Sequence, residues 1–211
     1  MKRFLMVTAL LAVAAVPAFA ASVADVGPSS VASELNLAEI CNQVYGTSYT
    51  NVAQMADIEV ANDDGIFALM DASTLVSGAR ARYAGLTQQF GYYRASDDTE
   101  VVMFDVTING TVFTDAWYAL NPTEVPNLTY QSDFDAQWVV PGEIVFFDDA
   151  PIDGGYPFYS DPTMNPNTED HMLAFLVNTE AIEGSDLFEY TYMLAWEDLR
   201  LGDSDYNDLV V

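Results

Sequence analysis

Basic side chains are the scarcest feature of this sequence. Its 211 residues include 6 Lys and Arg against 32 Asp and Glu, and the formal net charge at pH 7 is −26. Binding to a phosphate backbone requires clustered Lys and Arg, so the composition excludes nucleic acid and disfavours an anionic membrane surface. The natural counter-charges are metal ions, dissolved salt or a basic partner. The simplest alternative is an acidic surface that keeps the protein soluble.

Cysteine is also scarce, since Cys41 is the single one. An intrachain disulfide is therefore impossible, and the fold must be held by its core or by bound ions. A content of 51% hydrophobic and 13% aromatic residues is ample for such a core. Cys41 follows helical spacing with Leu37, Ile40 and Val44, so we expect it on the apolar face of a helix and not at a reactive site.

One long apolar run occurs, and it lies at the N-terminus. Lys2 and Arg3 precede the run Phe4 to Val16, which ends in the small-x-small pattern Ala18-Phe19-Ala20. This arrangement predicts a secretory signal peptide cleaved after Ala20, because the run is shorter than the roughly 20 residues that span a bilayer. We expect a secreted protein, extracellular or periplasmic, without a membrane anchor. Cleavage would remove two cations and no acid, and would leave a chain without lysine.

The chain after Ala20 predicts a tether followed by one domain. Gly, Pro and paired Ser indicate a tether over 21–30, and 31–211 is predicted to form a single domain. Within it we expect a helix over 31–45, closed by Gly46 in the left-handed conformation, and a second helix over 73–86. The helix-containing part would extend to residue 95, and a strand-rich acidic part would follow over 96–211.

Beyond the predicted helices, apolar residues recur at every second position, which is typical of strands. Asn109-Gly110 is a strong hairpin signal between two such runs, because both residues tolerate the positive φ of a type I′ turn. The predicted strands are 100–108, 111–120, 137–140, 143–147, 171–177, 187–196 and 209–211. These strands predict a mainly β fold, an antiparallel β-sandwich or jelly-roll-like domain with one or two short helices near the N-terminus.

Acids concentrate toward the C-terminus, where Asp203, Asp205 and Asn207 fall at alternate positions. This spacing lets a looped backbone turn several oxygens onto one hard cation, so we predict a Ca²⁺ site. An EF-hand does not fit, because that loop requires Gly at its sixth position and Glu at its twelfth. Here the sixth residue is Asp and the chain ends at the ninth. Further ligands must come from elsewhere, and Glu197 and Asp198 are the nearest.

A second polar segment, Asp161 to Asp170, is the next candidate source of ligands. It is rich in Pro, Asn and carboxylates, and cannot form a regular element. The alternative is that both acidic segments are solvated surface connections. His171 follows without a second His or a suitable Cys, so we expect a structural histidine and not a zinc ligand.

The C-terminal sequence resembles a known family. Glu197-Asp198 and Gly202-Asp203-Ser204-Asp205-Tyr206-Asn207-Asp208, followed by an apolar strand, resemble the signature of the exported bacterial family called domain of unknown function 4114. Weaker similarities occur upstream at Tyr83-Ala84-Gly85, Phe90-Gly91-Tyr92-Tyr93, Phe158-Tyr159-Ser160-Asp161 and Glu169-Asp170-His171. The resemblance implies an all-β secreted domain that binds calcium. The Pro-Glu-Pro sorting tail frequent in that family does not precede Val211, so we expect release into the periplasm or medium.

Together these features predict a secreted calcium-binding structural or interaction module without catalytic residues. The predicted ligands are Asp203, Asp205, Asn207, Asp208, Glu197, Asp198, Asp161 and Asp170. One alternative is a lectin-like protein that binds an extracellular polysaccharide or surface protein through aromatic side chains near the ion. Its candidate residues are Trp138, Tyr156, Phe158, Tyr159 and Tyr206. The other is a carboxylate-dependent glycoside hydrolase, although no nucleophile elbow, His-Glu-x-x-His helix or phosphate-binding glycine loop is present.

Overall fold

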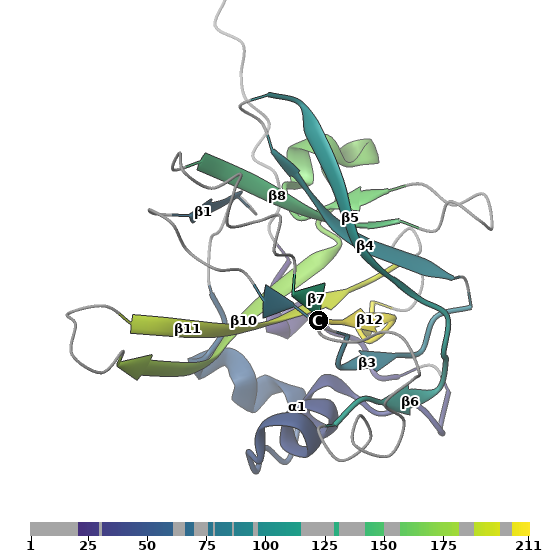
Figure 1. Cartoon of the computed structure of the whole chain (residues 1–211). Coiled ribbons are helices and arrows are strands. Elements are labelled where there is room, and N and C mark those ends of the chain that lie inside the picture. Colours follow the sequence, from purple (N-terminus) through teal and green to yellow (C-terminus); the bar gives the residue numbers. More distant parts are fainter. Residues whose placement is uncertain are drawn as a thin grey trace, which may run out of the picture.

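The computed structural model shows a mainly β protein built from antiparallel sheets, consistent with a β-sandwich. Two five-stranded sheets lie one above the other, and helix α1 lies beneath the lower one (Figure 1). No helix in the described residues is long and apolar enough to cross a membrane. The structure describes residues 21–29, 31–60, 66–69, 76–77, 79–85, 87–94, 97–114, 129–130, 142–149, 157–181, 188–198 and 204–211.

The upper sheet has the strand order β1-β8-β4-β5, with β9 paired to β8. Its strands are β1 (Ile66–Leu69), β4 (Gln88–Arg94), β5 (Thr99–Val106), β8 (Gly142–Asp149) and β9 (Phe158–Tyr159). Phe90 on β4 pairs with Phe104 on one side and with Asp148 on the other. A Cβ at Gly91 would collide with the carbonyl oxygen of Val101 and the ring of Phe147, so only glycine fits there.

The lower sheet has the strand order β10-β11-β12-β3-β6. Its strands are β3 (Ala81–Arg82), β6 (Thr111–Val112), β10 (Met172–Ala181), β11 (Phe188–Trp196) and β12 (Leu209–Val210). A separate two-stranded ladder joins β2 (Val76–Ser77) to β7 (Thr129–Tyr130). The predicted strands 143–147, 171–177, 187–196 and 209–211 are thereby confirmed as β8, β10, β11 and β12, whereas 137–140 lies outside the described residues.

Two hydrophobic cores lie on the two faces of the lower sheet. Between the sheets, Phe90 stacks on Phe104 and Phe146 with ring centroids 5.3 and 5.4 Å apart, and Trp196 meets Phe90 edge-on at 6.2 Å. Successive residues of β11 alternate between the cores: Leu194 and Trp196 face the upper sheet, while Met193 and Ala195 face α1. The lower sheet is therefore buried on both faces.

Helix α1 (Leu37–Tyr45) covers the lower face with its apolar side. The amide of Glu39 donates to the Asn36 side chain and the Glu39 carboxylate accepts from the Asn36 amide, which forms a capping box. Gly46 ends the helix in the left-handed conformation at φ 69°. The helix is shorter than the predicted 31–45, but Cys41 is buried beside Leu37 and Ile40 as expected. Short 3₁₀ turns flank it: η1 (Val23–Asp25) and η2 (Val52–Asp57).

The predicted helix over 73–86 is wrong, because this region contains β2 and β3. The Arg80 amide donates to the Val210 carbonyl at 2.6 Å, and its carbonyl accepts from the Phe113 amide at 2.7 Å. These bonds to neighbouring strands replace the i to i−4 bonds of a helix. Pairing across the lower sheet therefore overrides the helical spacing of the apolar residues.

The predicted hairpin at Asn109-Gly110 is also wrong. Strand β5 pairs with β4 in the upper sheet, and β6 pairs with β3 in the lower one. Gly110 has φ 71° and donates its amide to the Arg82 carbonyl at 2.8 Å, whereas Asn109 does not have the positive φ that a type I′ turn needs. The turn instead carries the chain from one sheet to the other. Residues 115–120 of the predicted second strand lie outside the described part.

The segment expected to be a tether is docked onto the domain. Val23 is buried and its amide donates to Glu59 Oε1 at 2.7 Å. The Ala21 amide donates to Asp170 Oδ2 at 2.8 Å, and the Gly27 amide donates to the Ser204 carbonyl at 2.7 Å. Residues 21–27 are thus held at three points along their length.

Candidate metal centre

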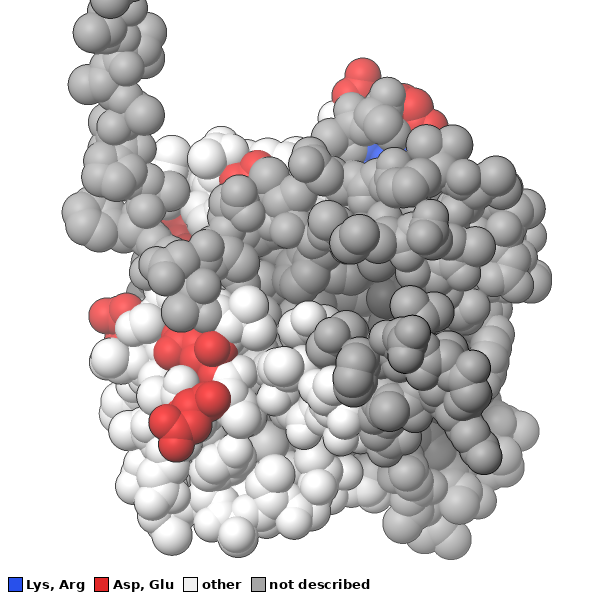
Figure 2. Space-filling view, turned by 90° about the vertical axis from the view of Figure 1, so that its left-hand side faces the viewer, with Lys and Arg blue, Asp and Glu red and all other residues white. Residues whose placement is uncertain are grey.

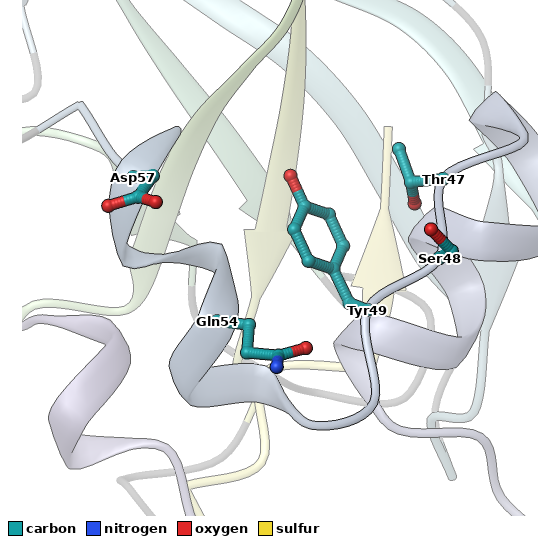
Figure 3. Close-up of a pocket in the computed structure, with 5 residues that line it drawn as sticks. All are labelled: Thr47, Ser48, Tyr49, Gln54 and Asp57. Atoms are coloured by element: carbon teal, nitrogen blue, oxygen red, sulfur yellow. The ribbon is translucent and has the colours of Figure 1, made fainter.

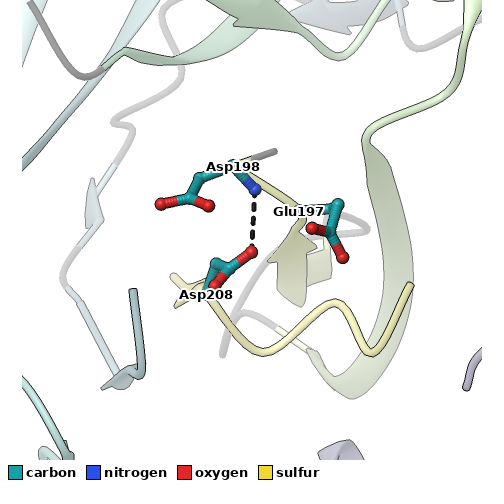
Figure 4. A group of neighbouring side chains, drawn as sticks. All are labelled: Glu197, Asp198 and Asp208. Carbon is teal, nitrogen blue, oxygen red and sulfur yellow. Dashed lines mark hydrogen bonds between the residues drawn. The ribbon is translucent and has the colours of Figure 1, made fainter. Parts of the chain in front are cut away.

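Three carboxylates meet where β11 ends and β12 begins. Trp196 pairs with Leu209 in the antiparallel ladder, so the residues just beyond them, Glu197 and Asp208, are brought together. Carboxylate oxygens of Glu197, Asp198 and Asp208 all lie within 4.8 Å of one another (Figure 4). The Asp198 amide donates to Asp208 Oδ2 at 2.9 Å, which holds two of these side chains in place. We call these three residues together with Asp148 the carboxylate cluster.

Asp148 enters the carboxylate cluster from β8, in the opposite sheet. Its side chain is only 2% exposed. Gln88 Nε2 donates to Asp148 Oδ2 at 3.0 Å and to Asp198 Oδ2 at 3.4 Å, so one amide group bridges carboxylates from the two sheets. No donor among the described residues reaches Asp148 Oδ1. A buried carboxylate oxygen of this kind is costly unless a cation or a proton satisfies it.

The negative charges in the carboxylate cluster repel one another. Burial, reinforced by the charges of Asp198, Asp208 and Asp149, holds the pKa of Asp148 well above its ordinary value, and Arg82 opposes this shift. Burial and the charge of Asp198 raise the pKa of Asp208 to about 8. Gln88 Oε1 in turn accepts from Arg82 Nε at 3.2 Å, so this cation lies beside the amide that bridges the carboxylates. The cluster therefore favours a bound proton or a bound cation over free carboxylates.

The loop before Asp208 is tightly coiled. Ser204 and Tyr206 have φ of 56° and 55°, in the left-handed region that non-glycine residues rarely adopt. Asp205 is buried, and its Oδ1 accepts from the Asn207 amide at 3.4 Å. Asn207 Nδ2 donates to the Leu35 carbonyl at 3.0 Å, so this amide fastens the segment ahead of α1. Asp203, the remaining predicted ligand in this loop, lies outside the described residues.

The Asp161 to Asp170 segment uses its polar groups differently. Asp161 Oδ1 accepts from the amide and the hydroxyl of Thr163 at 2.8 and 2.7 Å, which caps the turn η4 (Pro162–Met164). A second turn, η5 (Pro166–Thr168), follows. Asp170 Oδ1 accepts from the Met172 amide at 3.1 Å, while its Oδ2 accepts from Ala21. The structure gives these two predicted ligands backbone partners and does not place them in the group of three.

His171 holds the segment before β10 against the carboxylate cluster. It is fully buried, and its ring stacks on Phe158 with centroids 3.8 Å apart. Nδ1 lies 3.0 Å from the Glu197 carbonyl oxygen, which only accepts, so we assign the proton to Nδ1. Burial lowers the pKa of His171. These contacts fix the ring in the core, while Nε2 lies 3.7 Å from Glu169 Oε2 and has no hydrogen-bond partner among the described residues.

The aromatic candidates for carbohydrate stacking are largely enclosed. Phe158 and Tyr206 are buried, Tyr159 is half-buried against Phe147, and Trp138 and Tyr156 lie outside the described residues. A shallow pocket lies elsewhere, between the end of α1 and η2 (Figure 3). Its lining residues are Thr47, Ser48, Tyr49, Gln54 and Asp57. On the face shown in Figure 2, the described acidic side chains form separate patches among uncharged residues.

Sequence reasoning missed Asp148 and Gln88. A signal for Asp148 existed, because Asp148 and Asp149 directly follow the apolar residues predicted as a strand over 143–147. Two carboxylates at the C-terminal end of a strand lie where the chain leaves the sheet, which is a common place for ligand-binding residues. Gln88 carried no comparable signal, since a lone Gln in a strand is ordinarily a surface residue.

Residues 120–211 match the family model described as Domain of unknown function (DUF4114). All four carboxylates of the cluster fall within the matched residues. The similarities seen upstream at Tyr83 to Tyr93 fall outside them. No curated protein and no solved structure matches the chain.

Proposed function

We propose that this protein is an exported module that binds Ca²⁺ at the carboxylate cluster, where the ion joins the two sheets. The observation that carries the proposal is the approach of Glu197, Asp198 and Asp208 within 4.8 Å, with the buried Asp148 linked to Asp198 through Gln88. Two of these residues follow β11, one precedes β12 and one is the penultimate residue of β8. An ion bound among them would link both sheets.

The chemistry of the donors favours calcium. Ca²⁺ takes six to eight oxygen ligands in flexible geometry and accepts carboxylates in monodentate or bidentate form, whereas Mg²⁺ demands a near-ideal octahedron and keeps several waters. The carboxylate cluster supplies oxygen donors from four side chains on two sheets. Zinc structural sites are instead built from Cys and His, and the single Cys41 is buried in the core against α1.

The bound ion would act as a structural link. Neutralising the cluster removes the mutual repulsion that raises the pKa values of Asp148 and Asp208. An ion that binds the folded state alone stabilises it by RT ln(1 + [L]/Kd). Extracellular modules bind Ca²⁺ at about 10⁻⁴ to 10⁻³ M, so such a site fills outside the cell. The signal peptide predicted over residues 1–20 supports this setting.

Calorimetric titration of the protein starting at Ala21 with Ca²⁺ and then with Mg²⁺ tests the proposal. We expect saturable Ca²⁺ binding, weaker Mg²⁺ binding and a melting temperature that rises with Ca²⁺. Asp208→Asn keeps the shape and removes the charge, and should abolish most of the binding. Asp57→Asn, at an exposed acid of η2, is the matched control and should leave binding unchanged. No heat of binding and no thermal shift at millimolar Ca²⁺ would refute the proposal.

A further inference from the structure

The backbone nitrogen of Ala21 lies against a buried carboxylate. It is 2.8 Å from Oδ2 of Asp170, whose side chain is only 6% exposed. The other oxygen of Asp170 is held by the Met172 amide. The residues after Ala21 are fixed as well, because Val23 is buried and donates to Glu59. This nitrogen therefore occupies a defined position in the fold.

Ala21 is also the residue that cleavage after Ala20 would make the first of the mature chain. We propose that Asp170 is the binding site for the α-ammonium group released by this cleavage. Hydrolysis of the Ala20–Ala21 peptide bond consumes one water: the carboxylate leaves with the leader, and the amine stays on Ala21 and takes up a proton. The neutral N–H donor of the precursor thereby becomes a cation at the same atom, facing the Asp170 carboxylate.

The change of charge strengthens this contact. Hydrogen bonds between ionised partners are about twice as strong as those between neutral groups. An α-amino group has an ordinary pKa of about 7.7–8.0, so it is charged at neutral pH. The ammonium group gives the processed chain an ion pair with the buried Asp170 carboxylate, which the neutral amide of the precursor cannot form. Cleavage after Ala20 would therefore stabilise the folded state.

Asp170 is also connected to the carboxylate cluster. Its carbonyl accepts from the Tyr206 hydroxyl at 3.0 Å, and Tyr206 lies in the coiled loop ahead of Asp208. The next residue, His171, accepts at its carbonyl from the Glu197 amide at 3.0 Å and contacts the Glu197 carbonyl through Nδ1. The new ion pair thus braces the segment that positions Glu197 and the loop. This second step, tighter Ca²⁺ binding after processing, rests on the proposed function.

The mature sequence contains no lysine, so the α-amino group of Ala21 is the one amine that an acetylating reagent can modify. Acetylation removes the charge and keeps the N–H donor, as in the precursor. In EDTA we expect acetylation to lower the melting temperature by about 5 °C. In the Asp170→Asn variant acetylation should change it by less than about 1 °C. Asp25→Asn is the control, since Asp25 bonds to Ser22 and not to Ala21, and should retain the full effect.

Two further measurements distinguish the ion pair between Ala21 and Asp170 from its effect on Ca²⁺ binding. The Ala21 amine should be acetylated several times more slowly in the wild type than in Asp170→Asn, because the ion pair shields it. Calorimetry should give a Ca²⁺ Kd about fivefold weaker after acetylation. An unchanged melting temperature on acetylation, or an equal loss in Asp170→Asn, overturns the ion pair. If the protein binds no Ca²⁺, the proposed function fails, while the measurements in EDTA still decide the role of Asp170.

Discussion

Two acidic regions of this chain look alike in sequence and differ in their hydrogen-bond partners. In the Asp161 to Asp170 segment, backbone amides and a hydroxyl donate to the carboxylates. In the carboxylate cluster, Glu197, Asp198 and Asp208 face one another, and no donor among the described residues reaches Asp148 Oδ1. Asp161 and Asp170 in the first region therefore have donors of their own, although Glu169 Oε2 has no hydrogen-bond partner among the described residues. The second favours a proton or a cation.

The comparison shows that the number of acids does not identify an ion site. A carboxylate that caps a turn gains its stabilisation from fixed N–H dipoles, and its charge is compensated locally. A carboxylate placed against other carboxylates raises their pKa values, as it does for Asp148 and Asp208. The supply of donors around each oxygen distinguishes the two cases.

The largest expected contrast comes from neutralising one acid in each region. At a free Ca²⁺ concentration of 100 Kd, binding stabilises the folded state by about 2.7 kcal/mol. For a chain of this size, the melting temperature then rises by about 5–10 °C. Asp148→Asn should remove more than half of the Ca²⁺-induced rise in melting temperature, because Asp148 links the upper sheet to the ion. Asp161→Asn keeps the capping oxygen and should retain the whole rise. Differential scanning calorimetry with Ca²⁺ and with EDTA measures both, and equal losses would break the distinction.

The next effect concerns the Asp161 to Asp170 segment. Asn165 is buried, accepts from the Tyr159 amide at 2.7 Å, and donates to the carbonyls of Tyr159 and Glu169 at 2.8 and 3.0 Å. Asn165→Ala leaves these groups without their partner and should cost about 2 kcal/mol. Urea denaturation should show the same loss with and without Ca²⁺. Asn165→Asp keeps the acceptor but places a buried carboxylate against two carbonyl oxygens, and should cost at least as much. A Ca²⁺-dependent loss would mean that this region contributes to the ion site.

A further effect is expected from pH in the ion-free protein. Burial and repulsion raise the pKa of Asp208 from 3.8 to about 8. Between about pH 4 and pH 8 the folded state therefore holds a proton that the unfolded state has released, and stability falls as pH rises. The melting temperature in EDTA should drop from pH 5 to pH 8, and Asp208→Asn should flatten the profile. A rise over this range would contradict the electrostatic description of the cluster.

Local sequence signals predicted the elements that local interactions determine. Gly46 marked the end of α1, and the alternation of apolar residues marked β10, β11 and β12. The start of α1 was placed six residues too early, because the capping box of Asn36 and Glu39 was not used. The Asn109-Gly110 signal is also local, but it gave a wrong prediction. A turn signal does not indicate which strands the flanking segments will pair with. The spacing over 73–86 failed because β3 lies in a sheet buried on both faces, where apolar residues need not alternate.

The same distinction applies to the site. Glu197, Asp198 and Asp208 come from one stretch of sequence, and the β11–β12 ladder brings them together. Asp148 joins them only through the stacking of two sheets, which no motif in the sequence encodes. Asp161 and Asp170 have the right chemistry, but their partners are backbone amides whose positions depend on the fold. Sequence therefore indicated the acidic regions, and the tertiary structure distinguishes carboxylates that face one another from carboxylates that cap turns.

The smallest effect would sharpen the role of a single cap. Asp161→Ala removes the oxygen that accepts from the Thr163 amide and hydroxyl at the start of η4, and loss of a cap typically costs about 1 kcal/mol. We expect the melting temperature to fall by about 2–4 °C, equally in Ca²⁺ and in EDTA. Thr163→Val removes only the hydroxyl and should cost less than Asp161→Ala. If Asp161→Ala destabilises the protein only when Ca²⁺ is present, Asp161 is a ligand and the division between the two acidic regions fails.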